Sequence, residues 1–292
     1  VIIVGDIDRG GVFAWMKGTY DLLTLQEKKR VKGFIINKFR GDIELLVPGI
    51  KQFEELVPKP VLGVVPYEKN LVVDEEDSIS KWSYPTEPNA EGIINVAVIW
   101  TPRVSNFTDI SPLAYDPSVS LSYINHTSQL NKPDLIILLG SKNTIDDLIY
   151  LKEQKILEKV LKCHSDGSLI LGVCGGFQML GNTIRDPKNL ESRISECAGL
   201  GLFDMDTTFA SNKLTRQIEL KTVKSRLFKE GIKCNGYEIH MGRTNFKSNY
   251  PSLFSKIEDE NPMNFGITNK SGTAIGTYLH GFLNNNSLRQ DL

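Results

Sequence analysis

Cys174 is the residue whose surroundings suggest chemistry most directly. It follows the apolar run Leu169–Val173 and precedes Gly175, Gly176 and an apolar segment that begins at Phe177. This pattern predicts a strand that turns sharply into a helix, with glycines that relieve the steric cost of the strained bend. Such a bend exposes a nucleophile and aims the amide of Gly175 at the position where an oxyanion would form. The alternative is a small buried cysteine at the end of a core strand.

A thiol becomes an effective nucleophile at neutral pH when a base lies beside it, and the chain has four histidines to supply one. His280 closely follows the expected strand Thr273–Tyr278 and precedes Gly281, which would let the ring emerge at the edge of a sheet. Reactive groups gather at the carboxyl ends of strands in open α/β sheets, so we expect His280 to meet Cys174 there. A histidine that only hydrogen-bonds a neighbouring loop is the alternative.

His240 lies in a strand-like alternation that places it on the same face as Glu238. These two side chains could line the active-site cleft or orient the catalytic histidine. A solvated strand face explains the same alternation, so both interpretations stay open. His126 and His164 lie in polar, loop-like surroundings, and we expect them to be structural.

The turn Leu138–Thr144 joins an expected strand to an expected helix and contains Gly140. Backbone amides in such a turn can surround an anion, so it could supply a second oxyanion donor. A plain helix cap explains the segment equally well, with Asn143 or Thr144 at the N-terminus and acidic residues in the first turn.

Near the start of the chain, a strand-like run ends in a cluster that contains Asp6, Asp8 and Arg9 and is followed by paired glycines. Such a cluster suits phosphate and Mg²⁺ chemistry, although aspartate and glycine also form ordinary turns. Asn37, at the end of another expected strand, could bind a nucleotide base or close a turn. The chain contains no Gly-x-x-x-x-Gly-Lys-Ser/Thr loop, so these residues alone do not complete a nucleotide site.

Composition is that of an ordinary globular protein, with 292 residues, 40% hydrophobic residues and a net charge of -1. There is no bulk charge to attract nucleic acid or an anionic membrane, so a small-molecule substrate is favoured. We expect a cytoplasmic protein, because no run is long enough to cross a bilayer and the four dispersed cysteines argue against a zinc site and suggest a reducing compartment. The chain begins at Val1 without a methionine, so we expect a fragment of something longer.

Two α/β domains are expected, because short β-branched runs alternate with helix-like stretches on both sides of a segment rich in Pro and Ser. The expected boundaries are 1–80 for the first domain, 81–92 for the linker and 93–292 for the second domain. The first domain should contain the strands Val1–Val4, Gly33–Ile36 and Val61–Val65 and the helices Phe13–Leu23 and Pro48–Leu56. The second should contain the strands Ile93–Trp100, Leu135–Leu139, Ser168–Val173, Ile218–Val223 and Thr273–Tyr278 and the helix Ile145–Leu161.

Several of these segments, in this order, resemble the signatures of the cobyric acid synthase family, which consists of glutamine-dependent amidotransferases of cobalamin biosynthesis. The segments are Asp6–Phe13, Ile36–Asp42, Gly172–Gly181, Gly236–Gly242 and Gly276–Gly281. The resemblance implies a dethiobiotin-synthetase-like, P-loop type parallel-sheet fragment followed by a flavodoxin-like class I glutamine amidotransferase domain. The family's Walker A loop would precede the first residue here, so we expect only the glutaminase half to be active.

By the same resemblance, Cys174 attacks the carboxamide of glutamine to form a thioester and ammonia, with His280 as acid and base. Gly140, Gly175 and Gln178 would form the oxyanion and glutamine-binding site. The ammonia would serve ATP-dependent amidation of the b, d, e and g carboxylates of adenosylcobyrinic acid a,c-diamide, which gives cobyric acid. Glutamine, ATP with Mg²⁺ and the corrinoid are the implied ligands, with no tightly bound cofactor. The ATP and corrinoid side would use Asp6, Asp8, Arg9 and Asn37.

The chain departs from many class I relatives in having no acid two residues after His280, where they read His-Pro-Glu. The residue that orients the imidazole is therefore unidentified, and Glu238 is the expected candidate. Alternative functions are a cobyrinic acid a,c-diamide synthase, a glutaminase serving another acceptor such as a cell-wall precursor, and a non-catalytic subunit of the same fold.

Overall fold

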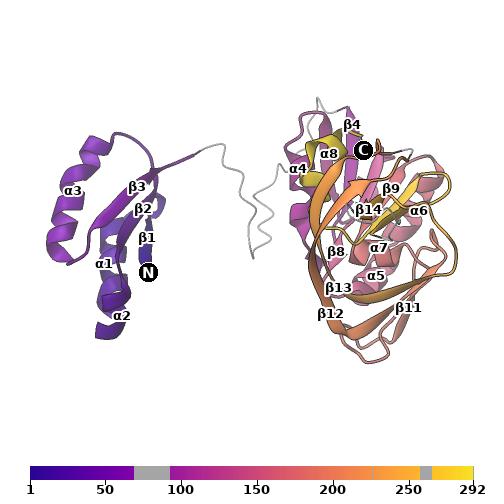
Figure 1. Cartoon of the computed structure of the whole chain (residues 1–292), viewed down its shortest axis with the longest axis horizontal. Helices are drawn as coiled ribbons and strands as arrows, with labels where there is room; N and C mark the ends of the chain where they lie inside the picture. The colour runs from indigo at the N-terminus through magenta and orange to yellow at the C-terminus, as the bar shows by residue number, and fades with distance from the viewer. Residues whose placement is uncertain (69–92, 226, 257–264, 292) are drawn as a thin grey trace. The chain divides into compact units, whose positions relative to one another are not determined.

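The chain divides into two compact units, Val1–Val73 and Asp74–Leu292 (Figure 1). The computed structural model of the protein describes residues 1–68, 93–225, 227–256 and 265–291. The linker expected over 81–92 lies outside the described residues, and the expected boundaries at 80 and 93 stay predictions. Across the described ranges, every helix is too short or too polar to span a membrane.

The first unit is a three-stranded parallel sheet in the order β1-β2-β3, accompanied by helices. Its elements are β1 (Ile2–Asp6), η1 (Ile7–Arg9), α1 (Val12–Leu22), α2 (Leu25–Arg30), β2 (Gly33–Phe39), α3 (Ile43–Leu56) and β3 (Val61–Pro66). Met16 of α1 and Phe53 of α3 pack with Phe34 and Ile36 of β2 in the core of this unit. The three strands predicted from the β-branched runs are confirmed.

Helix α3 begins at Ile43 rather than at Pro48, where the sequence placed it. Asp42 supplies the start, because its side chain accepts a hydrogen bond from the backbone amide of Glu44 at 2.9 Å. Pro48 therefore lies inside the helix and marks no boundary.

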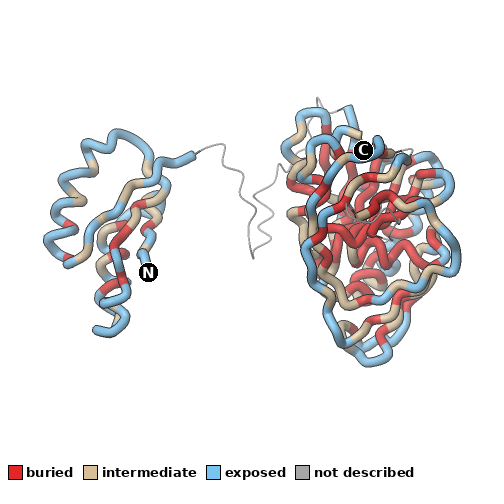
Figure 2. The backbone as a smooth tube through the Cα atoms, in the orientation of Figure 1, coloured by how far each residue is buried: buried red, intermediate tan, exposed pale blue. Residues whose placement is uncertain are grey.

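The second unit is built on a six-stranded sheet in the order β15-β16-β9-β7-β4-β6. All neighbouring strands are parallel except β15, which runs antiparallel to β16. The strands are β4 (Ile94–Ile99), β6 (Val119–Ile124), β7 (Leu135–Leu138), β9 (Leu169–Val173), β15 (Gly266–Thr268) and β16 (Ala274–Thr277). Buried residues concentrate in these strands (Figure 2), which is typical of a parallel sheet covered on both faces. The α/β architecture predicted for this part of the chain is confirmed.

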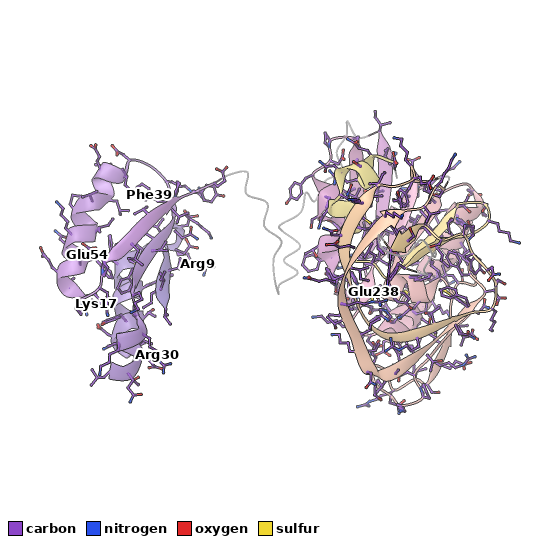
Figure 3. All side chains as sticks on the ribbon, in the orientation of Figure 1. Arg9, Lys17, Arg30, Phe39, Glu54 and Glu238 are labelled. Carbon is purple, nitrogen blue, oxygen red and sulfur yellow. The ribbon has the colours of Figure 1, made fainter. Side chains whose placement is uncertain are left out.

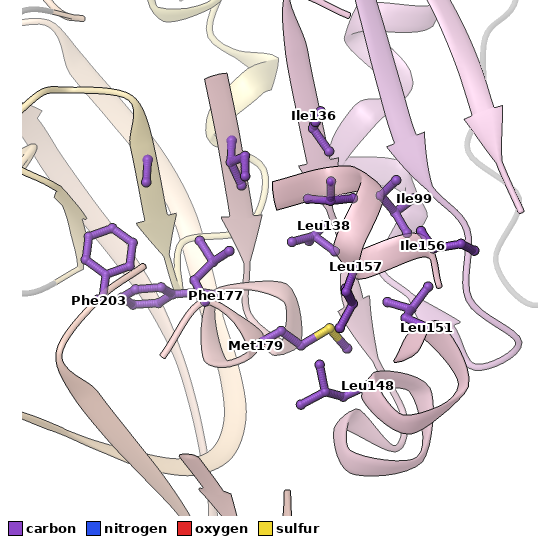
Figure 4. Packing of buried hydrophobic residues seen from close by; sticks show 14 of the residues in the cluster. Ile99, Ile136, Leu138, Leu148, Leu151, Ile156, Leu157, Phe177, Met179 and Phe203 are labelled. Atoms are coloured by element: carbon purple, nitrogen blue, oxygen red, sulfur yellow. The ribbon is translucent and has the colours of Figure 1, made fainter. Parts of the chain in front are cut away.

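Two hydrophobic cores lie on opposite faces of this sheet, as the alternation along β4 shows. Ala97 and Ile99 join the core formed with α5 (Thr144–Glu153), α6 (Ile156–Ser165) and α7 (Gly175–Met179), part of which Figure 4 shows. Val96 and Val98 join the other core. That core includes side chains from η2 (Phe107–Ile110), α4 (Ser111–Ala114), η4 (Phe282–Asn284) and α8 (Asn286–Asp291).

A second, curved sheet lies in the same unit and is dominated by one long hairpin (Figure 1). It contains β10 (Thr183–Arg185), β11 (Glu196–Ala198), β12 (Met205–Thr222), β13 (Lys233–Phe246) and β14 (Phe254–Lys256). The remaining short elements are β5 (Val104–Ser105), which pairs with β8 (Gly140–Ser141), and η3 (Thr127–Gln129). The strand expected over Ile218–Val223 is thus only the last part of β12, which extends because β13 pairs along most of its length.

The single helix expected over 145–161 is wrong, because the segment forms two helices, α5 and α6. The chain breaks at Lys155, which has a φ of 57°. Leu151 and Ile156 are both fully buried, but on a continuous helix they would point about 140° apart. The break lets both side chains enter the same core.

Gly276 in β16 lies against the ring of Phe177 in α7, and a Cβ at Gly276 would overlap that ring. We expect Gly276→Ala to lower the free energy of unfolding by about 1 to 3 kcal/mol, because the core there has no room for another carbon. Phe177→Leu should also cost stability, but the two changes together should cost less than their sum. Chemical denaturation of the four proteins measures this, and strictly additive losses would contradict the direct contact.

Candidate active site

Cys174 lies at the sharp bend between β9 and α7, as predicted from the apolar run and the glycines. Its backbone has φ 52° and ψ -108°, so the strain falls on the cysteine itself. From the sequence, Gly175 and Gly176 were expected to relieve that strain. Instead, both glycines lie inside α7 and are buried. A Cβ at Gly176 would overlap the carbonyl oxygen of Leu138, so glycine is needed there for α7 to pack directly on the sheet.

Cys174 and His280 follow the ends of neighbouring parallel strands. Thr277 of β16 pairs with Val173 of β9, and the Cys174 amide donates a hydrogen bond to the Thr277 carbonyl oxygen at 2.8 Å. His280, a few residues farther along, is completely buried. The topology therefore brings the two side chains to the same edge of the sheet.

Asp109 is the hydrogen-bonding partner of the His280 imidazole. One carboxylate oxygen lies 2.7 Å from His280 Nδ1, and the other accepts a hydrogen bond from the Gly281 amide at 2.8 Å. Asp109 is 4% exposed, so this pair is shielded from water. Asp109 was not predicted from the sequence, because it lies in η2 within a polar stretch without periodicity. The available signal was weak: an acidic residue soon after the end of the expected strand Ile93–Trp100.

The pKa of His280 reflects this environment. Burial alone would lower it, but the hydrogen bond with Asp109 and the interaction with the Cys174 sulfur raise it to about 10. The other ring nitrogen, Nε2, is buried and has no geometric hydrogen-bond partner among the described residues. The Tyr237 ring stacks on the imidazole at 5.0 Å between centroids and covers its face.

Glu238 does not orient His280, contrary to the expectation from sequence, because Asp109 occupies that position. It lies on β13 (Figure 3), where it accepts a hydrogen bond from Arg216 Nε at 2.5 Å and lies 3.7 Å from His240 Nε2. Burial would raise the pKa of Glu238, but its interactions with His240 and Arg216 lower it. Glu238 is 4% exposed, so the solvated-face interpretation is also wrong.

A cavity of about 480 Å³ opens in front of Cys174. Gly175 and Gln178 of α7 line it, together with His240 of β13 and other residues of the curved sheet and of the β5–β8 pair. His240 stacks on Tyr278 at 4.0 Å between ring centroids, which fixes its ring in the wall. This volume is typical of a small-molecule site.

The turn before α5 both caps that helix and approaches the cysteine. The Asn143 side chain accepts a hydrogen bond from the Asp146 amide at 3.0 Å, so the helix-cap interpretation is confirmed. A Cβ at Gly140 would lie 3.7 Å from Cys174 Cβ, and one at Gly175 would lie 2.9 Å from the Ser141 amide nitrogen. Backbone of this turn is therefore close enough to the sulfur to take part in an oxyanion site.

Gln178 is a pocket residue with a side-chain oxygen that has no hydrogen-bond partner among the described residues. It is 2% exposed, and its Oε1 has no hydrogen-bond partner within the described part of the chain. A buried acceptor without a partner is costly, so a bound donor in the cavity would satisfy it.

In the first unit, the expected ATP-side residues gather at the carboxyl ends of β1 and β2. Asp6 pairs in register with Asn37 and forms a 2.9 Å ion pair with Lys38. Asp8 pairs with Arg40 at 3.0 Å. The hydrogen bond with Lys38 lowers the pKa of Asp6.

Both carboxylates form partly exposed ion pairs with cationic side chains. Within the described residues, no three His, Cys, Asp or Glu side chains are grouped so that they could hold a metal ion. Arg9 is exposed beside them (Figure 3).

Comparison with known proteins identifies the class to which this fold and site belong. A structure titled PurLQS from Thermotoga maritima shares the fold, with a TM-score of 0.52, 19% identity and coverage of 70% of this chain and 97% of that one. Residues 95–288 match the sequence model of the CobB/CobQ-like glutamine amidotransferase domain. The chain therefore belongs to the CobB/CobQ-like glutamine amidotransferase family. Residues 4–79 match the CobQ/CobB/MinD/ParA nucleotide binding domain.

More particularly, the chain is 46% identical to the cobyric acid synthases of Alkaliphilus metalliredigens (strain QYMF) and Clostridium novyi (strain NT), over 296 and 288 residues. These alignments cover 99% and 98% of this chain but 58% and 56% of those proteins. The chain thus spans a little over half the length of the curated relatives it matches. The resemblance to cobyric acid synthases that the motifs predicted is confirmed.

We expect Asp109→Asn to lower the free energy of unfolding by about 3 kcal/mol near pH 6, because it leaves a buried imidazolium without its carboxylate. The folded pKa of His280, about 10, lies above the ordinary value of 6.5. The pair between Asp109 and His280 therefore stabilises the folded state fully below pH 6.5. This contribution is lost as the pH rises through 10. Urea denaturation across this pH range should show that the difference in unfolding free energy between the unmodified protein and Asp109→Asn shrinks towards high pH. Asp166→Asn, at an exposed position, is the control; a pH-independent difference would contradict the raised pKa.

Proposed function

We propose that the second unit hydrolyses L-glutamine to glutamate and ammonia, with Cys174 as the nucleophile. The observation that carries this proposal is the succession of Asp109, His280 and Cys174 at one sheet edge, where a cavity opens on the sulfur. The thiolate attacks the carboxamide carbon, and His280 Nε2–H protonates the departing ammonia, leaving a γ-glutamyl thioester. Water then gives a proton to Nε2 and attacks the thioester, which releases glutamate and restores the thiolate and imidazolium.

The surrounding residues take supporting roles in this proposal. The Gly175 amide and the backbone at Gly140 donate hydrogen bonds to the tetrahedral oxyanion. Gln178 lines the cavity and contributes to binding of the substrate. Asp109 holds the imidazole in one orientation and stabilises its positive charge. His240 forms a fixed part of the cavity wall, and Glu238 lies 3.7 Å from His240 Nε2.

For the whole protein, we propose that the ammonia is used to amidate the b, d, e and g carboxylates of adenosylcobyrinic acid a,c-diamide at the expense of ATP. The similarity to cobyric acid synthases over nearly the whole chain supports this choice over the other acceptors. The match of residues 4–79 to a nucleotide-binding domain supports the use of ATP. Asp6, Asp8, Arg9 and Asn37 would contact ATP or the corrinoid at the edge of the first sheet.

We expect Asp109→Asn to reduce the rate of glutamine hydrolysis by roughly 10³- to 10⁴-fold, because the imidazole loses the group that fixes its orientation and charge. Glu238→Gln removes a buried carboxylate of the same active-site region without touching His280. The fold reduction in the rate of hydrolysis should therefore be at least about tenfold smaller than for Asp109→Asn. Ammonia release from glutamine, measured on proteins with matching circular dichroism, compares the two. A larger loss for Glu238→Gln would contradict the assignment of Asp109.

The thiolate should react with an electrophilic analogue of glutamine. We expect diazo-oxo-norleucine to modify Cys174 and to leave the three buried cysteines, Cys163, Cys197 and Cys234, unmodified, since only Cys174 lines the cavity. Peptide mass spectrometry identifies the labelled residue, with L-glutamine as a protecting competitor. Failure to label Cys174 while a known amidotransferase is labelled would count against the mechanism.

A further inference from the structure

The cavity in front of Cys174 is lined by one acidic side chain among the described residues, Glu191, which the mechanism above does not use. Glu191 lies in the segment between β10 and β11, far in sequence from both the nucleophile and the histidine. No motif in the sequence pointed to Glu191 as a functional residue.

The segment that carries Glu191 is held rigidly. Asp186 is fully buried, and its carboxylate accepts hydrogen bonds from the amides of Leu190, Glu191 and Ser192 at 2.8, 2.8 and 3.0 Å. The Asn143 side chain also donates to the Glu191 carbonyl oxygen at 2.7 Å. The backbone at Glu191 is therefore fixed to the turn that approaches Cys174.

Only one of the two oxygens of the Glu191 carboxylate forms a hydrogen bond among the described residues. Its Oε2 accepts a hydrogen bond from the Thr144 amide at 3.2 Å, and its Oε1 has no hydrogen-bond partner in the part of the chain that the structure describes. Burial raises the pKa of Glu191 to about 7. A cation bound in the cavity would offset that burial and favour the ionised carboxylate.

The charges around the cavity are arranged to suit a zwitterion. Lys142 and Lys213 line the same cavity as Glu191 and can attract a carboxylate. Glutamine carries an α-ammonium and an α-carboxylate at one end and its carboxamide at the other. With the carboxamide at Cys174, the charged end must lie elsewhere in the cavity.

We propose that Glu191 binds the α-ammonium group of glutamine and so makes the site selective for an amino acid over other primary amides. This inference rests on the proposed function, since it takes glutamine as the ligand. Glu191 acts in binding only and exchanges no proton with the reacting atoms.

The test compares two ligands that differ only in the ammonium group. L-Glutamine has it, whereas glutaramate keeps the same chain, carboxylate and carboxamide without it. Binding is measured by calorimetry at about pH 8 in the Cys174→Ala background, so no turnover is required. Glu191→Gln should weaken L-glutamine binding about 10- to 100-fold, the usual effect of one hydrogen bond to a charged group. Glutaramate binding should change less than about twofold.

Glu153→Gln is the matched control, because Glu153 is an exposed carboxylate on α5 that borders a neighbouring cavity with Glu191 but does not line that of Cys174. It should change neither affinity. Glu191→Asp, which keeps the charge on a shorter side chain, should retain part of the preference for L-glutamine, and circular dichroism checks that each variant folds.

Equal weakening of both ligands by Glu191→Gln, or unchanged binding of L-glutamine, would overturn the role of Glu191. Ammonia release by the unmodified protein is measured separately. A protein that binds L-glutamine through Glu191 but releases no ammonia would contradict the proposed hydrolysis and leave the binding role standing.

Discussion

The buried contact between Asp109 and His280 is the interaction on which the site depends. A charged pair in the protein interior is costly unless further hydrogen bonds satisfy its remaining polar groups. Asp109 meets this condition by also binding the Gly281 amide, and the Tyr237 ring covers the imidazole. The contact sets both the orientation of the histidine and its affinity for a proton, and so determines whether Cys174 meets an imidazolium.

A second constraint is steric and acts on the bend at Cys174. The cysteine takes the unfavourable backbone angles itself, while Gly172 and Gly176 allow the helix and the sheet to approach more closely than any side chain would permit. Because the core on that side is closely packed, the bend has no room to relax. The parallel pairing of β9 and β16 then brings the strained cysteine and the histidine to one edge.

The parts of the site that could be predicted from sequence are those with a local pattern. An apolar run, a cysteine and two glycines indicated the bend, and two apolar strands indicated that Cys174 and His280 would share a sheet edge. Asp109 and Glu191 lie in polar segments without periodicity, and only the tertiary fold brings them to the cavity. Glu238 was chosen as the partner of His280 because its strand alternation was visible, whereas the pairing with Arg216 was not. The break between α5 and α6 was likewise hidden, since both helices carry apolar residues at similar spacing.

The central claim is that Asp109 and His280 form a hydrogen-bonded pair whose charged imidazole lies beside Cys174. Heteronuclear NMR of protein with labelled histidine nitrogens tests this most directly, with the His280 signal assigned from a His280→Asn variant. We expect the ring to stay protonated well above neutral pH and to titrate near 10, and we expect Asp109→Asn to move the titration down towards 6.5. A His280 ring that titrates at or below 6.5 in the unmodified protein would contradict it.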